Sequence, residues 1–184
     1  MKSTSRNRLF HMVFIALMTS VICVVSPFSF PLPFSPVPLS LTTFILYLSV
    51  YLLGAKHSFC ACCLYLIIGA VGIPVFSGFS GGFGKLLGPT GGYLLGYLCI
   101  PLIAGIIITP NRQRTFTCAA ALFISTLFCY LLGTVWLAFQ THLSFLSALS
   151  LGVLPFLPGD VCKIILVLLL GPRIYKRLQK AKIL

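Results

Sequence analysis

The chain has 184 residues, of which 59% are hydrophobic and 8% are charged, and its formal net charge is +12. Soluble domains carry about 25% charged residues, so this composition excludes an ordinary soluble domain and is typical of an integral membrane protein. A membrane-spanning helix needs about 20 mainly apolar residues, so the length allows about six spans with short connections. The basic residues cluster at the ends of apolar segments, which argues against a nucleic-acid-binding face.

The apolar runs predict an all-α integral membrane protein, a bundle of six transmembrane helices that forms one membrane domain over residues 1–184. The first run follows Lys2, Arg6 and Arg8 and has the outline of a signal peptide, but no small-residue cleavage site follows it, so we expect a retained helix. The predicted spans cover approximately residues 9–25, 39–53, 59–73, 92–108, 116–139 and 160–170.

Two uncharged connections have their own signatures. Five prolines between Pro27 and Pro38 remove backbone donors and predict an extended linker after the first span. The uncharged segment before the last span contains an apolar run between Leu143 and Leu151, which predicts a short interfacial or re-entrant helix.

A glycine-rich stretch follows the third span, and seven of the 16 glycines lie between Gly78 and Gly92. Glycine at this density excludes a stable helix and allows the backbone to approach a ligand closely. In lipid, irregular backbone is tolerated only where protein buries it or where it lines a cavity. The sequence therefore predicts that this loop lines an external cavity.

The distribution of basic residues predicts the orientation. If both termini are cytoplasmic, 11 of the 13 lysines and arginines lie on the inner side, as the positive-inside tendency requires. We therefore expect a multi-pass protein of the cell inner (plasma) membrane. The proline-rich linker, the glycine-rich loop and the segment before Asp160 would then share the external side.

Asp160 is the only acidic residue of the chain and precedes Lys163 by three positions. Residues at i and i+3 share one face of a helix, and a position just after Pro158-Gly159 suits a first-turn carboxylate. Ionisable groups within a span usually mark a functional site, which here would bind a small amphipathic molecule. The alternative is a structural helix cap beside a lysine that extends to water. Aromatic residues that would line the site are Phe76, Phe79, Phe83, Tyr93 and Phe156.

Other motifs do not support catalysis or a bound cofactor. The sequence GGFGK lacks the spacing of a phosphate-binding loop, and Leu86 stands where Ser or Thr would hold magnesium. His11, His57 and His142 lie in separate segments without acidic partners, so no metal site is expected. Cys60 and Cys63 form a C-x-x-C within an apolar run, which favours packed thiols over redox chemistry.

Three blocks of the sequence resemble the BioY family, the biotin-specific substrate-binding S components of energy-coupling factor (ECF) transporters. The blocks cover residues 73–97, 36–56 and 155–174, and the most specific motif is GPTGGYLLG at residues 88–96. The resemblance implies a six-helix subunit that binds biotin at its external face. It also implies a transmembrane coupling subunit and paired ATPases as partners, since the chain has no ATPase motif of its own.

The resemblance also implies a set of substrate-binding residues. The Asp and Lys of the family's third block fall on Asp160 and Lys163. In and after the glycine-rich loop, the further candidates are Phe79, Ser80, Gly81, Lys85, Thr90 and Tyr93. Lys85 would attract the valerate carboxylate of biotin or face water. Ser40-Leu41-Thr42 replaces the family's usual Thr-Leu-Gln, so a contact made by that glutamine would be lost or replaced.

Two other functional classes stay open at this point. A membrane-embedded thiol oxidoreductase would use Cys60 and Cys63, although the chain offers no base or metal set beside them. A structural or assembly subunit without a ligand would need Asp160 for folding alone.

Overall fold

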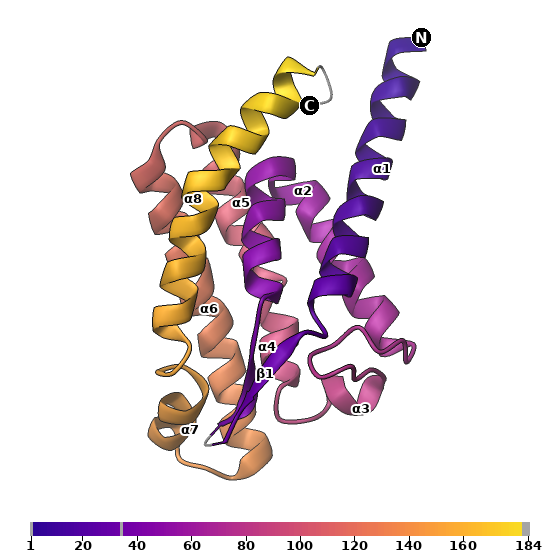
Figure 1. Cartoon of the computed structure of the whole chain (residues 1–184). Helices are drawn as coiled ribbons and strands as arrows, with labels where there is room; N and C mark the ends of the chain where they lie inside the picture. Colours follow the sequence, from indigo (N-terminus) through magenta and orange to yellow (C-terminus); the bar gives the residue numbers. More distant parts are fainter. Residues whose placement is uncertain (1, 34, 182–184) are drawn as a thin grey trace.

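The computed structural model describes residues 2–33 and 35–181, with side chains from residue 9 onward, and it is a bundle of helices (Figure 1). The side chains of Lys2, Arg6, Arg8 and Lys182, which enter the orientation argument, lie outside the described residues. The helices are α1 (Lys2–Val25), α2 (Thr42–Ala70), α3 (Phe83–Leu86), α4 (Gly91–Gly96), α5 (Cys99–Asn111), α6 (Thr115–Thr141), α7 (Phe145–Gly152) and α8 (Leu157–Lys180).

Several predicted elements are confirmed. Helix α1 contains the first predicted span, α6 extends the fifth by a few residues, and α7 is the short helix expected before Asp160. Ser144 caps α7, since its Oγ accepts a hydrogen bond from the backbone N–H of Ser147 at 3.3 Å. Such a cap satisfies one of the N–H groups that a helix start leaves unpaired.

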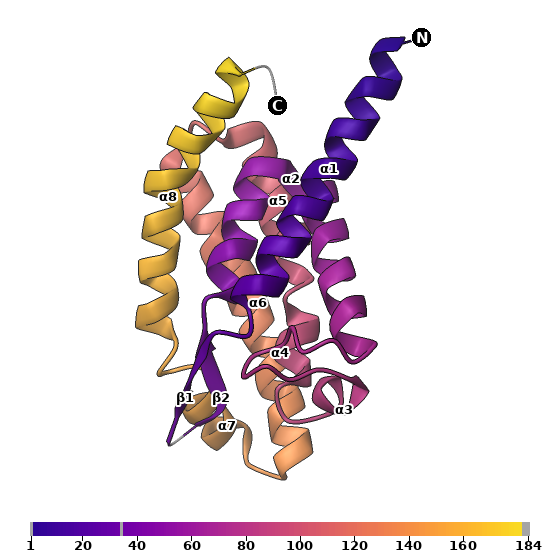
Figure 2. The same ribbon diagram turned by 45° about the vertical axis from the view of Figure 1, so that its right-hand side comes forward.

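The second and third predicted spans form one helical element, α2, which is interrupted at Gly54. This residue has φ 78° and ψ −174°, a conformation that is open to glycine and strained for other residues. The chain turns back there, so residues 42–53 and 55–70 run beside each other in the bundle (Figure 2). Helical structure already starts at residue 55, earlier than the predicted start at 59.

By length and composition, the described residues include three helices able to cross a membrane: Thr42–Ala70, Gly91–Asn111 and Thr115–Thr141. The count rises to four if α7 and α8, which meet at a bend of 49°, form one span. The architecture is therefore that of an all-α membrane protein with several apolar helices. The count of six spans stays a prediction.

The proline-rich linker forms an antiparallel hairpin of β1 (Ser29–Leu32) and β2 (Ser35–Ser40), with Ser29 opposite Ser40 and Phe30 opposite Leu39. The expected extended backbone is present, but the pairing was not predicted. Proline is tolerated because both strands of a two-stranded sheet are edges. Since Leu39 and Ser40 belong to β2, α2 starts at Thr42 and not at residue 39.

The expectation that glycine excludes helix was wrong for part of the glycine-rich stretch. Residues 83–86 form one turn, α3, and Gly91 and Gly92 begin α4. A Cβ added at Gly92 would lie 2.2 Å from Cβ of Trp136, so α4 packs closely on α6 only because this position has no side chain. This packing offsets the low helix propensity of glycine.

Helix α8 also extends beyond its predicted end, from residue 170 to Lys180, and continues through Pro172. The prediction stopped where apolar residues give way to basic ones, but a helix can continue beyond an apolar span. Arg177 and Lys180 lie in the last turn, where cations interact favourably with the helix dipole.

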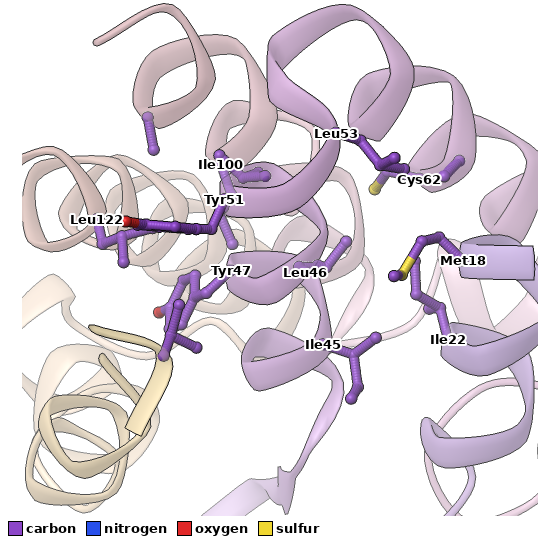
Figure 3. Close-up of a cluster of buried hydrophobic side chains, with 14 of the residues drawn as sticks. Met18, Ile22, Ile45, Leu46, Tyr47, Tyr51, Leu53, Cys62, Ile100 and Leu122 are labelled. Carbon is purple, nitrogen blue, oxygen red and sulfur yellow. The ribbon is translucent and has the colours of Figure 1, made fainter. Parts of the chain in front are cut away.

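The main core surrounds the first half of α2, which packs against α1, α5 and α8. Figure 3 shows Met18 and Ile22 of α1 meeting Ile45 and Leu46 of α2. On another side, Tyr47 and Tyr51 of α2 are fully or almost fully buried, as are Ile100 of α5 and Leu122 of α6. This core fixes the beginning of α2 relative to α6 and α8, the helices that supply the polar site.

The irregular segments gather at one end of the bundle. The β1–β2 hairpin, α3 and α7 lie there, whereas the start of α1 and the last turns of α8 lie at the opposite end (Figure 1). This arrangement confirms that the three weakly charged segments share one face.

Candidate functional site

Asp160 lies in the first turn of α8, where the local sequence favours a carboxylate. The helix begins at Leu157, and Pro158 lies in its first turn. Backbone N–H groups there have no partner within the helix, so the missing N–H of proline costs no hydrogen bond. The helix dipole stabilises an anion at this end. The side chain of Asp160 is buried, with the residue 5% exposed, so its charge requires partners within the protein.

Lys163 supplies the opposite charge one turn later, as predicted from the i,i+3 spacing. Its Nζ lies 2.8 Å from Oδ1 of Asp160. The same ammonium donates to the carbonyl oxygen of Ser40 at 2.7 Å and to Oγ1 of Thr43 at 3.0 Å. These three acceptors match the three N–H donors of a lysine, so the buried cation is fully hydrogen-bonded.

The carboxylate of Asp160 receives two further hydrogen bonds. Thr43 donates from Oγ1 to Oδ1 at 3.0 Å, and the phenolic hydroxyl of Tyr130 donates to Oδ2. The network therefore connects the end of β2, the first turn of α2, α6 and α8. Buried ion pairs are tolerated when additional hydrogen bonds satisfy their remaining donors and acceptors.

A small cavity of about 40 Å³, partly open to solvent, lies beside this network. Small-molecule sites typically combine apolar walls with a few polar groups. Aromatic rings and the ion pair form much of the wall. The lining residues are Val37, Pro38, Ser40, Thr43, Tyr93, Tyr97, Ile100, Thr126, Cys129, Tyr130, Gly152, Phe156, Asp160 and Lys163.

Three of the eight predicted substrate-binding residues line this cavity: Asp160, Lys163 and Tyr93. Tyr93 comes from α4, and its ring is held closely by two glycines. A Cβ added at Gly133 would lie 2.2 Å from Cδ1 of Tyr93, and one added at Gly152 would lie 2.1 Å from its hydroxyl. The position of this ring therefore depends on glycines of α6 and α7.

The other five predicted residues lie outside the lining of the cavity. Phe79 is 61% exposed, and its ring meets Phe28 edge-on with centroids 5.3 Å apart. Ser80 donates from Oγ to the carbonyl oxygen of Ser77 at 2.8 Å. Gly81 is packed against backbone, since an added Cβ would lie 2.4 Å from the carbonyl oxygen of Ile73.

Lys85 is half-buried in α3, and Thr90 is buried before α4. The glycine-rich loop was predicted to line the cavity, but its residues are not among the lining residues. The helix that follows it, α4, contributes Tyr93 instead. Among the expected aromatic residues, Phe156 lines the cavity, whereas Phe76 is in the core against Tyr65. Phe83 is exposed.

The sequence interpretation missed several residues of the site. Tyr130 and Thr126 lie four residues apart on α6, so they share a face of that helix. Thr126 also pairs with the hydroxyl of Tyr47 at 2.6 Å. Two hydroxyl side chains at helical spacing in an apolar run are a signal that could have been used, but their partner Asp160 is 30 residues beyond Tyr130.

The other candidate chemistry lies elsewhere. Cys60 is exposed and Cys63 is half-buried on α2, and both thiols are free. His11 and His57 stack with ring centroids 4.3 Å apart. Within residues 2–33 and 35–181, no three His, Cys, Asp or Glu side chains gather in a way that could hold a metal ion.

These features define the class of the protein: a multi-pass helical membrane protein with a buried charge pair in the wall of a cavity. The model of one family, described as the BioY family, matches residues 1–180. The chain belongs to the BioY family.

Named relatives agree with this assignment. The chain is 34% identical over 173 residues to the biotin transporter BioY2 of Lactococcus lactis subsp. cremoris, and the match covers 94% of each chain. It is 36% identical over 146 residues to the biotin transporter BioY of Thermotoga maritima, which covers 79% of this chain and 85% of the relative.

A solved structure shares the fold along nearly the whole chain. The crystal structure of the S-component for biotin from an ECF-type ABC transporter superposes with a TM-score of 0.87 at 28% identity. The match covers 93% of both chains. The resemblance noted in the sequence is thus confirmed at the level of family and fold.

Proposed function

We propose that this chain is a biotin-binding membrane subunit that mediates biotin uptake. The observation that carries the proposal is the buried pair of Asp160 and Lys163 in the cavity wall, on a fold shared with the S-component for biotin. The names of the relatives support the choice of substrate, because they describe biotin transporters.

The chemistry of biotin suits this pair. The ureido group of biotin has two N–H donors and one carbonyl acceptor, and the molecule also carries an apolar ring and a carboxylate. In the proposed complex, a ureido N–H donates to Asp160, and Lys163 donates to the ureido carbonyl or to the carboxylate. Tyr93, Tyr97 and Phe156 supply the apolar surface. In the free protein Oδ2 of Asp160 accepts one hydrogen bond, from Tyr130, and can accept another from a ureido N–H, while Lys163 would exchange one of its present acceptors for an oxygen of biotin. An analogue without the ureido group cannot donate to Asp160, so it binds less tightly.

The energy for transport would come from other proteins. We propose that a transmembrane ECF coupling subunit and paired ATPases associate with this chain, which acts as a single membrane domain. The chain would lie in the cell inner (plasma) membrane with both termini cytoplasmic, as the basic residues predict. The cavity end of the bundle would then face the exterior.

The five loop candidates remain part of the proposal. Phe79, Ser80, Gly81, Lys85 and Thr90 lie on or near the cavity end of the bundle, and closure of the glycine-rich loop would bring them toward biotin. Neither an enzymatic role for Cys60 and Cys63 nor a ligand-free structural role receives support from the family, and we propose that the chain is not an enzyme.

An uptake assay tests the proposed function. Cells that lack biotin synthesis and their own biotin uptake would receive this chain with or without coupling and ATPase subunits, and accumulation of labelled biotin would be measured. We expect uptake in the complete system and its loss when Lys163→Met replaces the native chain. Uptake that is equal in cells with an empty vector would contradict the proposal.

A further inference from the structure

A second cleft lies far from the biotin site, at the end of the bundle that holds the last turns of α8. It has a volume of about 850 Å³ and lies, partly open to solvent, between the α5–α6 connection and α8. Lys176, which lines it, follows Asp160 by 16 residues on α8, so the two positions are about 24 Å apart along the helix. The cleft is therefore separate from the cavity described above.

The charge of this cleft is strongly positive. Arg112 and Arg114 from the α5–α6 connection and Lys176 from α8 line it, together with the neutral polar residues Asn111, Gln113 and Gln179. The only acidic side chain of the protein, Asp160, is paired with Lys163 in the other site. No acidic side chain of this chain can therefore neutralise the cleft.

Arg112 is held in position without using all of its donors. Its guanidinium carbon lies 4.2 Å from the centroid of the Tyr175 ring, and its carbonyl oxygen accepts a hydrogen bond from the hydroxyl of Tyr51 at 2.6 Å. Its Nε–H group is buried and has no acceptor in the part of the chain that the structure describes. A buried donor without a partner costs free energy, so this position favours an added acceptor.

The surroundings of the cleft indicate where that acceptor comes from. Phe116, next to the lining residue Thr115, is 87% exposed, and Leu169 and Leu170 of α8 are exposed one turn before Pro172. The cleft thus lies where lipid-facing apolar side chains give way to basic ones. This boundary is the level at which phospholipid head groups lie.

We propose that this cleft binds the phosphate of an anionic phospholipid head group. The arginine guanidinium groups pair with phosphate oxygens, Lys176 adds a point charge, and Phe116 and Leu170 contact the acyl chains. A free phosphate shares the head-group chemistry but makes no use of the apolar border, so the lipid is the better fit. The proposal does not depend on biotin binding.

Native mass spectrometry of the detergent-purified chain tests this site. Phosphatidylglycerol and phosphatidylcholine with identical acyl chains are added separately, and inorganic phosphate serves as a competitor. The double variant Arg114→Gln/Lys176→Gln removes two charges from the cleft. The matched control Arg173→Gln/Lys180→Gln removes two exposed charges of α8 outside it.

We expect the native chain and the control variant to retain phosphatidylglycerol in preference to phosphatidylcholine, with little displacement by phosphate. Each basic side chain near a membrane surface strengthens binding of anionic lipid about fivefold, so the cleft variant should bind roughly 25-fold more weakly. Both variants should keep the melting temperature of the native chain, which shows that they are folded.

Three results would overturn the proposal. Equal weakening in the cleft and control variants would mean that net charge alone attracts the lipid. Full displacement of the lipid by phosphate would mean that the cleft is a site for a free anion. Unchanged lipid retention in the cleft variant would mean that the cleft does not hold the lipid.

Discussion

The hydroxyl of Tyr130 on α6 donates a hydrogen bond to Oδ2 of Asp160 on α8, while Lys163 holds the other oxygen of the same carboxylate at 2.8 Å. The phenol therefore links the two helices that form one side of the cavity. It also means that an incoming ligand meets a carboxylate that is already oriented by its neighbours.

Tyr130→Phe removes this link without changing the ring. A hydrogen bond to a charged group contributes about 1.5 to 3 kcal/mol, so we expect the variant to lose stability within this range. Thermal unfolding of the purified protein measures the effect. For the control, Tyr175→Phe removes only an exposed hydrogen bond from Gln179 and keeps the aromatic ring under Arg112. Equal melting temperatures for both variants would contradict the proposed role of Tyr130.

Variants of the Asp160–Lys163 pair can distinguish a role in biotin binding from a role in folding. Lys163→Met leaves Asp160 as a buried charge without its cation, which costs about 3 to 5 kcal/mol. Asp160→Asn in the same chain removes that charge, and replacement of a whole buried pair is often neutral or stabilising. We therefore expect the double variant to regain most of the stability that Lys163→Met loses.

Biotin binding should behave differently from stability in the same series. The double variant has no charged acceptor or donor for the ureido group, so we expect it to bind as poorly as each single variant. Equilibrium binding of labelled biotin measures this. Recovery of native affinity in the stable double variant would show that the pair serves folding only.

Gly133 acts on the site through Tyr93. An added Cβ would lie 2.2 Å from Cδ1 of the Tyr93 ring, so Gly133→Ala must displace this ring or separate α4 from α6. Overpacking of this kind costs about 1 to 3 kcal/mol. We expect lower stability together with weaker biotin binding. Gly84→Ala is the control, because a Cβ at that position meets no atom within 4 Å. Similar behaviour of the two alanine variants would be evidence against close packing at Tyr93.

Gly54 is required at the reversal of α2. Its φ of 78° disfavours any L side chain, and an added Cβ would lie 2.9 Å from Oγ1 of Thr109. Strained backbone of this kind costs about 1 to 3 kcal/mol. We expect Gly54→Ala to lower the melting temperature, whereas Gly69→Ala tests packing against the Phe76 ring without backbone strain. A Gly54→Ala protein as stable as the native chain would show that the reversal tolerates other residues.

The parts of the site that follow from local spacing could be predicted from the sequence. Asp160 and Lys163 are one turn apart on one helix, so their pairing needs no knowledge of the fold. Tyr130 and Thr43 come from helices 30 and 117 residues away from Asp160, and only the packing of the bundle brings them to the carboxylate. The spacing of Thr126 and Tyr130 marks a polar face of α6, but no local pattern identifies Asp160 as the partner of Tyr130 or of Thr43.

The same distinction applies to the fold. Apolar runs predicted the approximate positions of the long helices, because hydrophobic length is a property of each segment alone. The hairpin depends on pairing between Ser29 and Ser40 across the linker, and α4 depends on contact between Gly92 and Trp136. The sequence interpretation placed Ser29 in an unpaired linker and Ser40 in the second span, so it missed the hairpin, whereas it started the fourth span near Gly92 without identifying the contact with α6.

The most direct test of the central claim is equilibrium binding of labelled biotin to the purified, folded chain, with dethiobiotin and lipoate as competitors. Dethiobiotin keeps the ureido group, whereas lipoate keeps a sulfur ring and a carboxylate but has no ureido group. We predict saturable biotin binding that dethiobiotin displaces and lipoate does not. Absence of binding by the folded protein, or displacement by lipoate as effective as by dethiobiotin, would contradict recognition of the ureido group by Asp160 and Lys163.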